Sequence, residues 1–181
     1  MLKKRIDRNS IVFLGDSLTE WFNLEEYFAR NDLVNRGVAG DITDGVLYRL
    51  GEITNARPAK IFLMIGVNDV FQGYSDDHIA HNIKTIIDRI LEETPGSKLL
   101  VQSILPVNED YFIVKDNLNS KIVKINQKLK DFCKLRKLDF IDLHKDFLLH
   151  GKLNPDYTYD GGHLTEQGYK NWAQILKSYI N

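Results

Sequence analysis

The sequence lacks the features that mark several large classes of protein. Its 181 residues include a single cysteine, Cys133, which excludes an internal disulfide and any metal site built from several cysteines. No apolar run approaches the ~20 residues that span a bilayer, and no long block of like charge could form a nucleic-acid footprint. We therefore expect no membrane insertion and no nucleic-acid binding. Cys133 lies among apolar residues of an expected helix and is interpreted as a buried filler.

The balance of charges and the lack of repeats and linkers indicate an ordinary globular chain. The 24 basic and 25 acidic residues give a net charge of -1, and 43% of residues are hydrophobic. With no internal repeat or Pro/Gly-rich linker, residues 1–181 are expected to form a single domain. The basic opening residues precede an apolar run too short for a signal peptide, so the chain as written is expected to be cytoplasmic. The oligomeric state is left open.

Short apolar runs alternate with segments of helical periodicity along the whole chain. The runs predict buried strands at 11–14, 33–35, 60–65, 99–104 and 138–141. The periodic segments predict helices at 24–30, 46–53, 79–91, 118–135 and 167–180. Such alternation is typical of βαβ units, in which helices cover both faces of a parallel sheet. The predicted fold is therefore α/β, a three-layer α/β/α sandwich with a mostly parallel five-stranded sheet.

Ligands of such sheets bind beyond the carboxyl ends of the strands, so functional residues are expected directly after each strand. The first strand leads into Gly15-Asp16-Ser17, a turn that would present the Ser17 hydroxyl at the edge of the sheet. Asp16, Ser17 and Thr19 could equally well cap the helix that starts there. The turn alone does not decide between a nucleophile and a cap.

The next two strands are followed by glycine and short polar residues. Gly37 and Gly40 follow the second strand, and Gly40 could bring a bare backbone amide close to a ligand, although a plain turn explains it too. After the third strand, Asn68 could donate from its side-chain amide. An Asx turn, with Asp69 bracing the loop, is the alternative.

A fourth segment, Asp160-Gly161-Gly162-His163, precedes the last helix. A carboxylate three residues before a histidine can accept a hydrogen bond from Nδ1 and leave Nε2 free as a base. The other histidines lack this setting and are interpreted as structural: His78, His81, His144 and His150. Serine chemistry needs a nucleophile, a base, a group that orients the base, and oxyanion donors, and the four segments together supply all of these parts.

These four segments, in this order, resemble the sequence blocks of the SGNH hydrolases, named for their Ser, Gly, Asn and His. The resemblance spans residues 12–169 and implies a flavodoxin-like fold and a carboxylic ester hydrolase that needs no cofactor or metal. It implies Ser17, Asp160 and His163 as the catalytic residues, with the oxyanion held by Ser17, Gly40 and Asn68. Gly37 competes for the glycine role, but Asp41 follows Gly40 and favours it, which leaves Gly37 as a turn residue.

The function expected from this resemblance is hydrolysis of a small O-acyl ester, with acetyl preferred and a carbohydrate as one alcohol partner. Lysophospholipase, thioesterase and acyltransferase activities would use the same site. A metallophosphoesterase could draw its metal ligands from Asp16, Asn68, Asp69, Asp160 and His163, but the sequence has no His-x-His. A non-catalytic binding protein is a further alternative. Some aromatic residues could line the cleft or simply pack: Tyr111, Phe112, Tyr157 and Tyr159. Trp21 and Trp172 are interpreted as packing residues.

Overall fold

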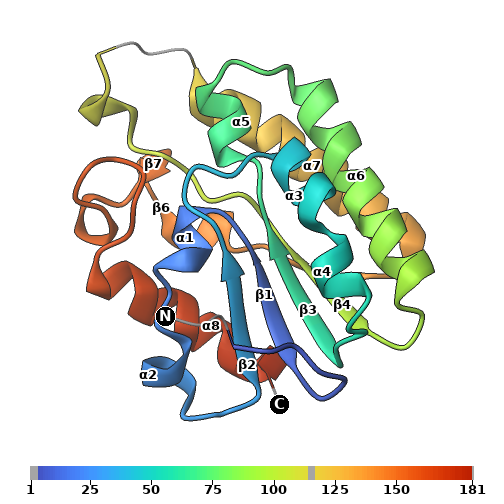
Figure 1. Ribbon diagram of the computed structural model, residues 1–181. Helices are drawn as coiled ribbons and strands as arrows, with labels where there is room; N and C mark the ends of the chain where they lie inside the picture. Colours follow the sequence, from blue (N-terminus) through green and yellow to red (C-terminus); the bar gives the residue numbers. More distant parts are fainter. Residues whose placement is uncertain (1–3, 114–116, 181) are drawn as a thin grey trace.

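A five-stranded parallel sheet forms the centre of the computed structural model, which describes residues 4–113 and 117–180 (Figure 1). The strand order is β2-β1-β3-β4-β5. Their bounds are β1 Ile11–Gly15, β2 Leu33–Gly37, β3 Lys60–Met64, β4 Lys98–Gln102 and β5 Asp139–Ile141. Each of the five predicted strands is confirmed, with its ends within two residues of those expected. The central strands are buried because helices cover both faces of the sheet, as an all-parallel sheet requires.

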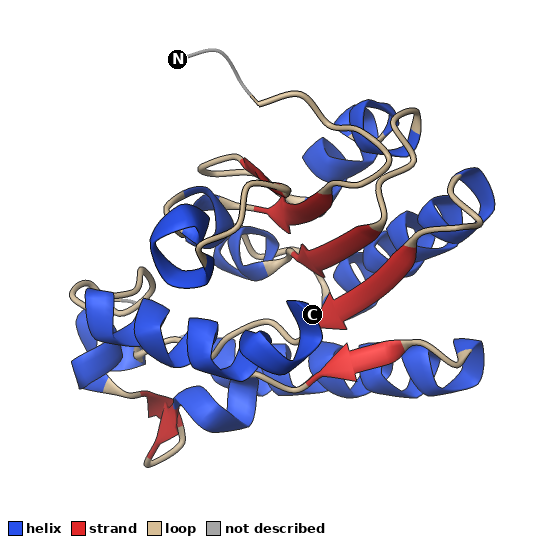
Figure 2. Ribbon diagram, turned by 90° about the horizontal axis from the view of Figure 1, so that it is seen from below, coloured by secondary structure: helices blue, strands red, loops and turns tan. Residues whose placement is uncertain are grey.

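Helices lie on both faces and complete the three layers that the sequence predicts (Figures 1 and 2). Their bounds are α1 Ser17–Glu20, α2 Leu24–Phe28, α3 Thr43–Arg49, α4 Gly51–Thr54, α5 Val67–Phe71, α6 Asp76–Glu93, α7 Leu118–Arg136 and α8 Glu166–Ile180. Helices α2 and α8 pack together on one face, while α3, α6 and α7 pack together on the other. One expected helix is wrong as a single element, because residues 46–53 divide between α3 and α4 at Leu50, just before the weak helix former Gly51.

Helix α6 shows how local sequence sets these elements. Ser75 caps its amino end by accepting a hydrogen bond from the amide of His78. Isoleucines at three- and four-residue spacing, including Ile79, Ile83 and Ile86, are almost completely buried. The apolar stripe predicted for this segment therefore packs into the core.

Several short elements near the site were not anticipated from periodicity. They are the 3₁₀ turns η1 Glu109–Tyr111, η2 His144–Phe147 and η3 Pro155–Tyr157, and the antiparallel pair β6 Leu148–Leu149 and β7 Lys152–Leu153. The turn η1 lies between β4 and α7, in a segment of which residues 114–116 lie outside the described residues. Just before η1, the amide of Asn108 donates to the carbonyl of Gly161 at 2.8 Å. This bond ties that segment to the loop that carries His163.

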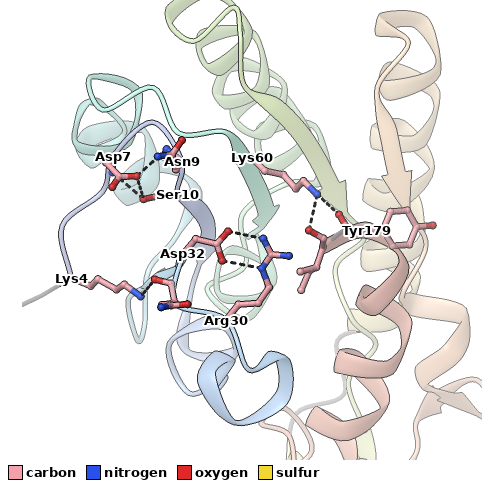
Figure 3. Close-up of polar contacts among 10 residues, drawn as sticks. Lys4, Asp7, Asn9, Ser10, Arg30, Asp32, Lys60 and Tyr179 are labelled. Atoms are coloured by element: carbon pink, nitrogen blue, oxygen red, sulfur yellow. Dashed lines mark hydrogen bonds and ion pairs between the residues drawn. The ribbon is translucent and has the colours of Figure 1, made fainter.

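Polar contacts fasten the chain around the amino ends of β1, β2 and β3 (Figure 3). Asp7 accepts hydrogen bonds from Asn9 and Ser10 in the turn before β1. Arg30 and Asp32 form a two-bond ion pair before β2. Lys60, at the start of β3, donates to the last carbonyls of α8, where a cation complements the helix dipole.

The core contains two of the packing residues that the sequence suggested, Trp172 and Cys133. Trp172 is completely buried, and its indole N–H donates to Gln102 at 2.8 Å, which satisfies both polar groups. Cys133 is buried as expected, and burial raises the pKa of its thiol to about 11, so it is an inert filler. Within residues 4–113 and 117–180, none of the helices is both long and apolar enough to cross a membrane.

Candidate active site

The turn between β1 and α1 places Ser17 at the carboxyl edge of the sheet. Asp16 caps α1 by accepting a hydrogen bond from the amide of Leu18 at 3.0 Å. Ser17 begins the helix, so the cap and the candidate nucleophile are neighbouring residues and the two interpretations of this turn are compatible. Burial raises the pKa of the Asp16 carboxyl to about 7. A Cβ atom on Gly15 would lie 2.3 Å from both the Met64 carbonyl oxygen and the Thr19 hydroxyl, so the close turn requires glycine there.

The structure brings Ser17, His163 and Asp160 into one hydrogen-bonded chain. Ser17 Oγ lies 3.1 Å from His163 Nε2, and His163 Nδ1 lies 2.6 Å from Asp160 Oδ2. These distances fit a tautomer in which Nδ1–H donates to the carboxylate and Nε2 accepts from the serine hydroxyl. The arrangement can therefore take a proton from Ser17 and deliver it to a leaving group.

Asp160 is held by backbone as well as by the imidazole. Its Oδ1 atom accepts hydrogen bonds from the amides of Gly162 at 2.9 Å and His163 at 2.7 Å. Burial alone would raise the pKa of this carboxyl, but the hydrogen bonds from His163 and from the two amides outweigh it and hold the pKa below its ordinary value. Asp160 is therefore ionised at neutral pH, as a partner for a charged imidazole must be.

The loop that carries His163 is fixed at Gly161. This residue has φ +91°, and a Cβ atom there would lie 2.7 Å from the carbonyl oxygen of Asn108. Its amide donates to the Thr158 hydroxyl at 2.9 Å, and that hydroxyl donates to the carbonyl of His163 at 2.7 Å. Glycine is needed here both for its positive φ and for the close approach.

Asn68 lies on the short helix α5 and faces the same cavity as Ser17. Its side-chain amide donates to the carbonyl of Asp41 at 2.8 Å. A primary amide carries two N–H donors, so one hydrogen fixes the side chain while the second remains for a ligand. The bond to Asp41 reaches a residue 27 positions earlier in the chain, so it is a long-range contact and not the local bond of an Asx turn.

The turn that contains Gly40 is held at several points around the glycine. The amide of Val38 donates to Gly15 at 3.1 Å, and the amide of Ala39 donates to Glu20 at 2.8 Å. Asp41, the next residue after Gly40, forms a partly buried ion pair with Arg49 at 2.7 Å. These contacts fix the position of the turn relative to α1.

Asp69 holds the chain at Thr43, three residues after Gly40. Its carboxylate accepts hydrogen bonds from the amide of Thr43 at 3.1 Å and from the Thr43 hydroxyl at 2.5 Å. Asp69 is completely buried, and burial raises its pKa above the ordinary value despite these bonds. The structure thus supports the bracing role considered for Asp69.

Two candidate oxyanion donors are backbone amides. Among the described residues, none accepts a hydrogen bond from the amide of Ser17 or from that of Gly40. Gly40 is not one of the residues that line the cavity beside Ser17, but it directly precedes Asp41, whose carbonyl holds Asn68. Both amides are therefore free to bind a ligand that reaches them.

The role expected for Gly37 is wrong. We expected a turn residue, but Gly37 is the last residue of β2, and a Cβ atom there would lie 2.1 Å from the backbone nitrogen of Glu20. It is a glycine because α1 packs directly on the strand. The turn belongs instead to Gly40, which has φ +76° and open space around its Cβ position.

The cavity beside Ser17 has a volume of about 210 Å³ and is largely apolar. Its lining comprises Leu18, Val67, Asn68, Phe71, Phe112 and Gly162, together with the three residues of the hydrogen-bonded chain. Phe71 and Phe112 meet edge to face with ring centroids 5.3 Å apart. Phe71 was missed from the sequence, although it lies three residues after Asn68 and so on the same side of α5.

The other aromatic residues considered for the cleft lie in different surroundings. Tyr159 stacks near His163, with ring centroids 6.4 Å apart. Tyr157 packs on Phe147 instead, and Tyr111 is about half exposed. Trp21, interpreted as a packing residue, stacks on the His163 ring with centroids 4.3 Å apart. Its spacing of four residues from Ser17 is the sequence signal that could have found it.

Comparisons with known proteins show which family the chain resembles. A model of the GDSL-like lipase/acylhydrolase family matches residues 13–170. Platelet-activating factor acetylhydrolase IB subunit alpha2 of Rattus norvegicus is 31% identical over 179 residues, which cover 94% of this chain and 75% of that protein.

Solved structures resemble the whole chain. A GDSL-like lipase from Bacteroides thetaiotaomicron superposes with a TM-score of 0.85 at 27% identity, covering 95% of this chain and 87% of the other. An acetylxylan esterase from Geobacillus stearothermophilus superposes with a TM-score of 0.77 at 16% identity, covering 98% and 97% of the two chains. The latter likeness shows the shared fold alone.

The two competing glycines should respond differently to alanine. Gly37→Ala places a Cβ against the backbone of Glu20, and we expect a loss of about 3 kcal/mol in the free energy of unfolding, at the upper end of overpacking costs. Gly40→Ala meets no atom but must adopt a positive φ, which costs about 1–2 kcal/mol. Urea unfolding of both variants measures the difference. A Gly40→Ala protein that is less stable than Gly37→Ala would contradict these assignments.

Proposed function

Because the chain belongs to the GDSL-like lipase/acylhydrolase family, whose members are carboxylic ester hydrolases, we propose that it is a serine esterase that removes a small acyl group. Ser17 is the nucleophile, His163 the base and Asp160 the group that orients the base. The observation that carries this proposal is the chain of contacts from Ser17 Oγ to His163 at 3.1 Å and from His163 to Asp160 at 2.6 Å.

The reaction proceeds through an acyl-enzyme in two steps. His163 Nε2 accepts the Ser17 proton while Oγ attacks the ester carbonyl carbon, which gives a tetrahedral oxyanion and an imidazolium. The C–O bond to the alcohol then breaks as the imidazolium returns the proton to the leaving oxygen. In the second step His163 takes a proton from water, the resulting hydroxyl attacks the acyl carbon, and the carboxylic acid leaves as Ser17 regains its proton. Asp160 accepts a hydrogen bond from Nδ1–H throughout.

Three donors are proposed for the oxyanion: the amides of Ser17 and Gly40 and the side chain of Asn68. The free backbone amides and the fixed Asn68 side chain support this assignment. Donors that are already oriented stabilise the developing charge without reorganising, and each contributes about 2.7–4 kcal/mol in comparable sites. The contacts that fix the Gly40 turn and Asn68 supply that orientation.

A small acyl group is proposed from the size and lining of the cavity. A volume of about 210 Å³ bounded by Leu18, Val67 and the pair Phe71 and Phe112 favours a short apolar chain. The rat relative is named as an acetylhydrolase, which supports acetyl as the acyl group. The alcohol is proposed to be a carbohydrate or another small molecule, which would lie on the open side of the site.

Metal-assisted phosphoester hydrolysis has less support. The described parts of the chain contain no group of three or more His, Cys, Asp or Glu side chains placed to hold a metal ion. Asp16 and Asp69, which such a site would recruit, bind backbone amides at Leu18 and Thr43 instead. In the serine mechanism, the carboxylates of Asp16 and Asp69 support the backbone at Leu18 and Thr43 and take no part in the reaction.

The proposal predicts metal-free esterase activity that depends on Ser17. With EDTA present, the wild type should hydrolyse p-nitrophenyl acetate faster than the corresponding octanoate, because the cavity is short. Ser17→Ala should lose the activity on acetate by a factor of about 10⁴ or more, since no other residue supplies the nucleophile.

The same assay separates the alternatives. Activity that EDTA abolishes would favour a metal-dependent enzyme, and activity that persists in Ser17→Ala would reject the nucleophile. A preference for octanoate would reject the small acyl group. Product alcohol added as a competing acceptor distinguishes transfer of the acyl group from hydrolysis.

Asn68→Ala should lower kcat by about 10²–10³ while changing KM little, because the Asn68 amide is proposed to act on the oxyanion of the transition state. Steady-state kinetics on p-nitrophenyl acetate measure both constants. The matched control is Asn9→Ala, in the turn before β1 (Figure 3), which should leave both constants unchanged. Equal losses in the two variants, or a rise in KM alone, would remove Asn68 from the oxyanion site.

A further inference from the structure

The stacking of Trp21 on His163 has no part in the mechanism described above. The two rings lie with centroids 4.3 Å apart and planes inclined by 28°. The imidazole is thus contacted at Nδ1 by Asp160, at Nε2 by Ser17 and on its face by Trp21. The first two contacts have assigned roles, whereas the third does not.

The position of Trp21 follows from the short helix that carries Ser17. Trp21 is the C-cap residue of α1, and its amide donates to the carbonyl of Ser17 at 3.0 Å. Residues separated by four positions lie on the same side of a helical turn. One turn of backbone therefore presents both Ser17 and the indole to His163.

Neither packing in the core nor contact with the acyl group explains why residue 21 is a tryptophan. Trp21 is 46% exposed, whereas Trp172 in the core is completely buried. Trp21 is also not among the residues that line the cavity beside Ser17. A large apolar side chain that is half exposed contributes little to the core, and its main aromatic contact is the ring of His163.

Hydrogen bonds at two edge nitrogens do not fully fix an imidazole. These bonds bend easily out of the ring plane, so the ring can still tilt toward either face, and such a tilt takes Nε2 and its lone pair out of line with Ser17 Oγ. A planar group on the face of the ring opposes the tilt. An indole face also attracts an imidazolium more strongly than a neutral imidazole, by the cation–π interaction.

We propose that Trp21 is a positioning residue that keeps the His163 ring aligned between Ser17 and Asp160 and stabilises the imidazolium formed as Ser17 attacks. This inference rests on the proposed role of His163 as base. Trp21 therefore affects how readily Ser17 attacks, and it has no effect on which acyl group is selected.

The test compares Trp21→Leu and Trp21→Phe for the rate at which a small fluorophosphonate labels Ser17, and for kcat and KM on p-nitrophenyl acetate. Trp21→Leu should lower the labelling rate constant and kcat together, by about 3- to 30-fold, with KM and the preference for acetate unchanged. Trp21→Phe, which restores an aromatic face, should recover most of the loss. Rates are normalised to the folded fraction measured by circular dichroism.

Two controls keep the inference separate from the proposed function. Tyr48→Leu removes an aromatic ring that is 95% exposed on α3 and should change neither rate. Labelling of the wild type but not of Ser17→Ala establishes the serine nucleophile, whatever the Trp21 variants do. A Trp21→Leu protein labelled at the wild-type rate would overturn the positioning role. An effect on KM alone, or equal losses in Trp21→Leu and Trp21→Phe, would overturn it too.

Discussion

The parallel pairing of β1 with both β2 and β3 is the constraint on which the site depends. It aligns Gly15 with Gly37 on one side and with Met64 on the other, so three loops leave the sheet at the same level. The strand order reverses at β1, because β2 lies on one side of it and β3, β4 and β5 lie on the other, and this opens a crevice at the carboxyl edge of the sheet. The turn that carries Ser17, the turn that contains Gly40 and the helix that carries Asn68 enter that crevice together. The loop from Asp160 to His163 reaches it from the other end of the chain.

Rigidity at this edge comes from polar contacts between the loops. Glu20 and Asp69 hold the Gly40 turn on its two sides, and the Asp41 carbonyl holds Asn68. Asp160 is likewise fixed by backbone amides before it contacts the imidazole. The proposed oxyanion site requires donors that are oriented before the reaction starts, and these contacts provide that orientation at the cost of burying the Asp69 carboxyl. The same edge of the sheet therefore supplies both the chemistry and its support.

Periodicity and the four motifs predicted the sheet, the long helices and the meeting of Ser17 with His163, because these features depend on local pattern and on strand direction. Other features depend on tertiary packing that no local pattern encodes. The sequence cannot show that a Cβ on Gly37 would meet Glu20, so that glycine was mistaken for a turn residue. Helical spacing places Trp21 near Ser17 and Phe71 near Asn68, but it does not show that Trp21 stacks on an imidazole 142 positions along the chain or that Phe71 meets Phe112.

The central claim is that Ser17 carries the acyl group during turnover. The most direct measurement is a rapid acid quench of the wild type during its first turnover of p-nitrophenyl acetate, followed by mass spectrometry of the digested protein. The account predicts one acetyl group on the peptide that contains Ser17. An acetyl group on another peptide, with Ser17 unmodified, would contradict it.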